Sequence, residues 1–132
     1  MELQERVRQF TLETLGAMGL SLDVKIDDTP DGIRVEISGE GGETLLRRRA
    51  EALDALQLIV NTAFRRELND DRSFVVDCLD YRKGKDAELR QMARFMMEKA
   101  KTSGPQEMGP LNPYSRRLVH LTVAEDLHLQ IA

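Results

Sequence analysis

The stretch LDVKIDDTPDGIRVEI, residues 22–37, decides the fold of the first part of the chain. Its apolar residues alternate with polar ones on both sides of a central turn, which is the pattern of strands that bury one face. Residues Asp27–Gly32 supply the turn around Pro30, because proline fixes φ and glycine accepts a positive φ. We therefore predict a β-hairpin with one set of buried side chains: Leu22, Val24, Ile26, Ile33, Val35 and Ile37.

Helical periodicity precedes and follows this hairpin. Residues 3–18 repeat apolar side chains at helical spacing and end at Gly19, a residue typical of helix C-termini. After a short turn at Leu45 and Leu46, a second helix is predicted from Ala50 to about Arg66. Its apolar stripe is expected to join the core: Leu53, Leu56, Ile59, Val60, Ala63 and Phe64.

A third strand is predicted at residues 73–78, which read SFVVDC. Cys78 lies in this strand and is expected to be a small buried apolar residue. The order helix, strand, strand, turn, helix, strand indicates a three-stranded sheet covered by helices. The fold class we predict is therefore α+β.

The second part of the chain is predicted to be mainly helical. Apolar residues keep helical period from Lys85 to Lys101, while Arg90 and Arg94 lie on another face, and Gly104 follows the segment. The apolar set of this helix is Leu89, Met92, Ala93, Met96 and Ala100.

Asn112 and Pro113 start a further helix, since asparagine caps helices and proline suits the first helical position. Arg116 and His120 are four residues apart on it and so project from the same side. Residues 127–131 alternate apolar and polar side chains and are predicted to begin a strand, which gives this part a partial sheet.

Charge and composition limit the possible functions. The chain has 132 residues with 19 Lys and Arg against 23 Asp and Glu, and its net charge of −4 is not the bulk signature of a nucleic-acid binder. Basic residues nevertheless gather in a few places, where a polyanion is expected to bind. These places are Arg47–Arg49, Arg65–Arg66, Arg82–Lys85 and Arg116–Arg117.

Other classes of protein are disfavoured by the sequence. No apolar run approaches the about 20 residues of a membrane span, and the N-terminus lacks a secretory pattern, so we expect a cytoplasmic protein. The single Cys78 with the separated His120 and His128 gives no metal-ligand cluster, and we expect no cofactor. No nucleophile, base and orienting group come together, so we expect no enzyme.

Three motifs together resemble a known family. They are ALDALQ at residues 52–57, DYR at residues 80–82 and LNPYSRRLVHL at residues 111–121. In these motifs the chain resembles the bacterial Jag proteins, also called SpoIIIJ-associated or KhpB proteins. The resemblance implies a KH-like domain at residues 1–80 and an Arg-x-x-x-His (R-3-H) domain at residues 81–132. It also implies a cytoplasmic protein that binds single-stranded RNA and is linked to sporulation, cell division or envelope control.

The resemblance also implies site residues. Arg116 and His120 match the Arg-x-x-x-His signature and are expected to contact nucleic acid, with Arg117, Arg94 and Arg90 as neighbours. Such a pair suits the phosphate backbone, because arginine and histidine donate to phosphate without reading bases. A small protein with only a KH domain is an expected partner, and a homodimer is a further option.

Two departures from the family limit what it implies. KH domains hold backbone phosphates at a Gly-x-x-Gly loop between two helices. Aligned without gaps, that loop falls on Arg47, Arg48, Arg49 and Ala50, so both glycines are replaced; a second register places it at Gly39–Gly42. The family's last basic strand is also missing after Ile131, which indicates a truncated second domain. The alternative function is a protein-interaction module whose KH part has lost RNA binding.

Overall fold

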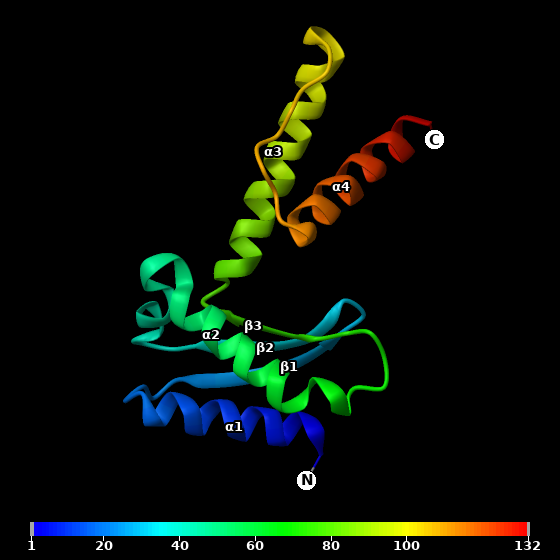
Figure 1. Ribbon diagram of the computed structural model, residues 1–132. Helices are drawn as coiled ribbons and strands as arrows, with labels where there is room; N and C mark the ends of the chain where they lie inside the picture. Colours follow the sequence, from blue (N-terminus) through cyan, green and yellow to red (C-terminus); the bar gives the residue numbers. More distant parts are fainter. Residues whose placement is uncertain (1, 132) are drawn as a thin grey trace. The chain divides into compact units, whose positions relative to one another are not determined.

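The computed structural model describes residues 2–131, and the side chains of residues 2–125. The chain divides into two compact units, residues 1–81 and residues 82–132. The first unit combines helices with a sheet and the second is built from helices, so the predicted α+β class is confirmed (Figure 1). The elements in chain order are α1 (Leu3–Ala17), β1 (Asp23–Thr29), β2 (Gly32–Ser38), η1 (Gly42–Leu46), α2 (Arg47–Phe64), η2 (Arg65–Glu67), β3 (Phe74–Cys78), α3 (Tyr81–Ser103) and α4 (Pro113–Ile131).

The sheet of the first unit has the order β1-β2-β3. β1 and β2 form the predicted antiparallel hairpin, in which Ile26 pairs with Val35. β3 lies parallel to β2, and Val76 pairs with Val35. A parallel pair needs a crossover between its strands, and η1, α2 and η2 supply it.

The core of the first unit lies between one face of this sheet and the helices α1 and α2. Alternate residues of each strand enter it, as the period-two pattern predicts, and Val35, Phe74 and Val76 are fully buried. Of the predicted α2 stripe, the structure buries Leu53, Leu56 and Val60. The prediction was wrong for Ile59, which is 44% exposed, and for Ala63, which is exposed, because the helix touches the sheet along a narrower stripe.

The second unit contains α3 and α4. The predicted start of α4 is confirmed, because the backbone N–H of Ser115 donates to Asn112 Oδ1 at 2.8 Å and Pro113 follows the cap. The prediction of a strand at residues 127–131 was wrong, since these residues continue α4. No glycine or proline interrupts the chain after Pro113, and the spacing of Leu127 and Ile131 fits a helix as well as a strand.

Cys78 is buried at the end of β3, as predicted. Burial raises the pKa of its thiol to about 11, and the carboxylates of Asp77 and Glu43 add to the shift. The fold therefore favours the protonated thiol, and the contribution of Cys78 to the free energy of unfolding falls as pH rises from 9.0 towards about 11.

We expect iodoacetamide at pH 8.5 to alkylate Cys78 about a hundredfold more slowly in the folded protein than in urea, because only the thiolate reacts. Mass spectrometry of timed samples measures both rates. Equal rates in the two conditions would contradict the buried position of the thiol.

Candidate nucleic-acid interface

The first candidate surface is the arginine loop, residues 47–50, which separates η1 from the right-handed part of α2. Arg47 has an extended backbone, with φ −63° and ψ 151°. The next three residues are left-handed, with φ of 53° at Arg48, 58° at Arg49 and 62° at Ala50. Non-glycine residues adopt this conformation at a cost of about 1–2 kcal/mol each, which explains why a loop of this shape favours glycine.

Buried residues hold the arginine loop on both sides. Leu45 and Ala50 are fully buried in the core, whereas Arg47, Arg48 and Arg49 between them are exposed. Gly42, at the start of η1, allows close packing on the end of β3, since a Cβ there would lie 3.1 Å from Cys78 Sγ. The loop therefore projects three guanidinium groups from a fixed base.

These guanidinium groups have no acidic partner in the part of the chain whose side chains the structure describes. None of the three arginine side chains forms a hydrogen bond or ion pair with a residue whose side chain the structure describes. They also lie directly before the right-handed part of α2, which begins at Glu51, and cations at a helix N-terminus oppose the helix dipole. Three neighbouring cations repel one another, so the arginine loop is a candidate site for an anion.

Backbone strain in the arginine loop is testable by glycine substitution. We expect Arg49→Gly to raise the free energy of unfolding by about 0.5–1 kcal/mol, because glycine accepts the left-handed conformation at little cost. Arg47→Gly removes the same charge at an extended residue, and we expect it to lower stability by a similar amount through unfolded-state entropy. Thermal unfolding followed by circular dichroism compares the two variants. Equal melting temperatures would contradict the left-handed backbone at Arg49.

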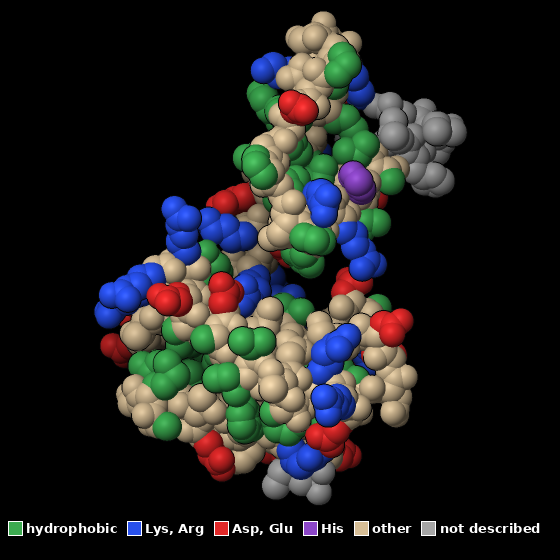
Figure 2. All heavy atoms as spheres, viewed as in Figure 1, with side chains coloured by type: hydrophobic (Ala, Val, Ile, Leu, Met, Phe, Trp, Pro, Cys, Tyr) green, Lys and Arg blue, Asp and Glu red, His purple; other side chains and the backbone are tan. Residues whose placement is uncertain are grey.

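The second candidate surface is the α4 basic face, formed by Arg116, Arg117 and His120. These residues line an open depression of about 520 Å³ together with Pro113, Leu121 and Ala124. All three polar side chains are exposed, and none is bonded to a residue whose side chain the structure describes. Figure 2 shows a histidine side chain in purple at the surface, with basic and apolar side chains around it.

Helical spacing explains how the α4 basic face forms. Arg116 and His120 lie one helical turn apart, while Leu118 and Thr122 point to the other side of α4 and are buried. The hydroxyl of Tyr114 donates to Asp86 Oδ2 of α3 at 2.6 Å and so ties the start of α4 to α3. The two predicted neighbours Arg90 and Arg94 lie on α3, where both are exposed, and neither lines the depression.

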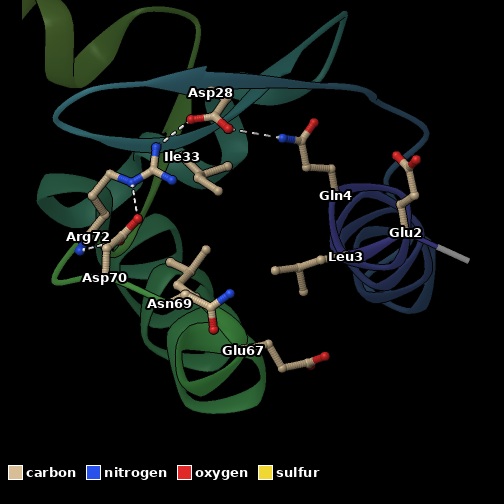
Figure 3. Close-up of a pocket in the computed structure, with 10 residues that line it drawn as sticks. Glu2, Leu3, Gln4, Asp28, Ile33, Glu67, Asn69, Asp70 and Arg72 are labelled. Carbon is tan, nitrogen blue, oxygen red and sulfur yellow. Dashed lines mark hydrogen bonds and ion pairs between the residues drawn. The ribbon is translucent and has the colours of Figure 1, made fainter.

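A further depression of about 390 Å³ lies in the first unit and is acidic (Figure 3). On one side of it Arg72 pairs with Asp28 and with Asp70, the latter at 2.9 Å. The backbone N–H of Arg72 donates to Asp70 and lowers the pKa of that carboxyl. Glu2 and Glu67 add two carboxylates to the lining, and Glu67 forms an ion pair with Arg6. Carboxylates outnumber cations in this lining, so the depression is not part of the candidate interface.

Two features of the candidate surfaces were not predicted from the sequence. The left-handed backbone at residues 48–50 carries no local signal, because glycine or asparagine normally marks such positions. The contact of Tyr114 with Asp86 joins residues 28 positions apart and has no sequence pattern. The spacing of Arg116 and His120, in contrast, was sufficient to place both on one face.

Comparison with known proteins gives two similar sequences. The chain is similar to RNA-binding protein KhpB. The KhpB protein of Clostridium symbiosum is 25% identical over 130 residues, which cover 96% of this chain and 59% of that protein. The KhpB protein of Bacillus subtilis (strain 168) is 26% identical over 110 residues, which cover 83% of this chain and 53% of that protein. The chain thus spans a little over half the length of these relatives, and they support the Jag resemblance.

A comparison with protein-family profiles matches no family. In the described part of the chain, no helix has the length and apolar character needed to cross a membrane.

Proposed function

We propose that this chain binds single-stranded RNA, without catalysis, through the arginine loop and the α4 basic face. The observation that carries the proposal is the α4 basic face, where Arg116, Arg117 and His120 line one open depression without a partner among the described side chains. Groups of this kind donate charge-assisted hydrogen bonds to phosphate oxygens. The similar proteins, both named RNA-binding protein KhpB, indicate RNA as the source of those phosphates.

The proposed contacts are to the RNA backbone. Arginine grips a phosphate with two donors and histidine adds one more, and neither contact reads the base. The chain has 5% aromatic residues and no tryptophan, so base stacking contributes little to affinity. We therefore expect a shallow sequence preference and a strong dependence on salt.

The Jag resemblance supports a more detailed proposal. The unit of residues 1–81 acts as the KH-like domain, with the arginine loop in place of Gly-x-x-Gly, and the unit of residues 82–132 acts as the Arg-x-x-x-His domain. The cellular role proposed is post-transcriptional regulation connected with sporulation or the cell envelope in the cytoplasm. A small protein with only a KH domain is the proposed protein partner.

Filter binding tests the proposal with a random single-stranded RNA library, at low and at physiological salt. We expect the protein to retain RNA at low salt and to lose affinity as salt rises, because phosphate contacts release counterions. Double-stranded RNA of equal length serves as the comparison and is expected to bind more weakly. No retention at low salt would overturn the proposal and favour the alternative, a protein-interaction module that has lost RNA binding.

A further inference from the structure

Side chains of α2 cover the outer edge of β3. β3 is an edge strand, with β2 as its neighbour in the sheet. The Ser73 carbonyl accepts from the Ile33 N–H at 3.1 Å, and the Leu79 N–H donates to the Ile37 carbonyl at 3.0 Å. Bonding directions alternate along a strand. The N–H groups of Phe74, Val76 and Cys78 therefore point away from β2, towards the outside of the sheet.

Two amide side chains occupy this outer edge. The Phe74 N–H donates to Asn61 Oδ1 at 2.8 Å, and Asn61 Nδ2 donates back to the Phe74 carbonyl at 2.8 Å. The Val76 N–H donates to Gln57 Oε1 at 2.9 Å. Asn61 thus bonds to Phe74 as the backbone of a neighbouring strand would.

The spacing of the two amides matches the strand. Gln57 and Asn61 are four residues apart on α2, a rise of about 6 Å, and Val76 and Phe74 are two residues apart on a strand, a rise of about 6.6 Å. The remaining outward N–H, that of Cys78, donates to Asp77 Oδ1 at 2.8 Å. All three outward N–H groups of β3 are therefore satisfied by side chains.

We propose that Gln57 and Asn61 close the β3 edge against pairing with another extended chain, and in particular with β3 of a second copy. An uncovered edge strand presents a row of N–H and C=O groups on which a further strand adds. The sequence of β3, with Phe74, Val75 and Val76 in succession, favours strand pairing and aggregation. The two amides occupy the Phe74 N–H, the Phe74 carbonyl and the Val76 N–H, which such pairing needs.

Sedimentation velocity of the full chain over a hundredfold range of concentration tests this proposal. We expect the double variant Gln57→Ala/Asn61→Ala to sediment faster with rising concentration than the unmodified protein. Gln57→Glu keeps an oxygen that accepts from the Val76 N–H, so we expect it to sediment like the unmodified protein. Faster amide hydrogen exchange at Phe74 and Val76 in the double variant shows that the edge is open.

Val60→Ala is the matched control, because it weakens the same helix at a fully buried position away from the edge. Association of the Val60→Ala variant to the same extent would attribute the effect to lower stability and overturn the proposal. A folded double variant that sediments like the unmodified protein would also overturn it. If circular dichroism shows that the double variant is unfolded, the single variant Gln57→Ala, which removes one bond to β3, replaces it. Faster sedimentation of this single variant with rising concentration would support the proposal, and sedimentation like that of the unmodified protein would overturn it.

Discussion

Replacing Arg116 and His120 together with alanine is expected to weaken binding to single-stranded RNA by about tenfold or more, which corresponds to about 1.4 kcal/mol. Both side chains line the α4 depression and neither is bonded to another described side chain, so their removal affects binding to RNA rather than bonds within the protein. The slope of affinity against salt is expected to fall by about 0.7 for each phosphate that the variant no longer holds. Fluorescence anisotropy with a labelled random RNA measures both quantities.

Lys25→Ala is the control for this double variant, because Lys25 is exposed on β1 and lies outside both candidate surfaces and outside the basic segments of the sequence. It removes a positive charge, and we expect only a small decrease in affinity that does not depend on a particular contact. An equal decrease in the control and the double variant would mean that net charge, and not the α4 basic face, sets the affinity.

The largest expected decrease in stability follows from Phe74→Ala. Phe74 is fully buried in β3, and its ring meets that of Phe64 edge to face with centroids 6.5 Å apart. Removing a buried phenylalanine costs about 3–5 kcal/mol, because the surrounding core does not fill the cavity. This is a large share of the about 5–15 kcal/mol that stabilises an ordinary domain. We expect the urea midpoint of the first unit, followed by circular dichroism, to fall accordingly.

Phe95→Ala removes the same ring from α3, where the side chain is 65% exposed. We expect this control to change the free energy of unfolding by no more than about 0.5 kcal/mol. A Phe74→Ala variant as stable as the Phe95→Ala variant would contradict the core described for the first unit.

The fold of the first unit was predictable because its signals are local. Strict alternation in residues 22–37 determines which side chains of the hairpin face the core, and the structure has the same register. At residues 127–131 the alternating segment is too short to distinguish a strand from a helix, and the chain continues α4 there. The exposure of Ile59 could not be predicted from helical periodicity either, because the width of the buried stripe depends on how α2 packs against the sheet.

The two candidate surfaces differ in how far the sequence predicts them. The α4 basic face follows from helical spacing, because residues four apart share a side of any helix. The arginine loop was predicted as a basic segment, but its left-handed backbone depends on the buried anchors Leu45 and Ala50. The role of Gln57 and Asn61 was also hidden, since polar residues on a helix normally face solvent, and only the tertiary structure brings them to β3.

Ultraviolet crosslinking of the protein to single-stranded RNA, with the attached peptides identified by mass spectrometry, tests the central claim most directly. The account predicts that crosslinks concentrate in two segments, the peptide containing residues 113–121 of α4 and the peptide containing the arginine loop at residues 47–50. Crosslinks that fall mainly in the acidic depression around Asp28 and Asp70, or that avoid both predicted segments, would contradict it.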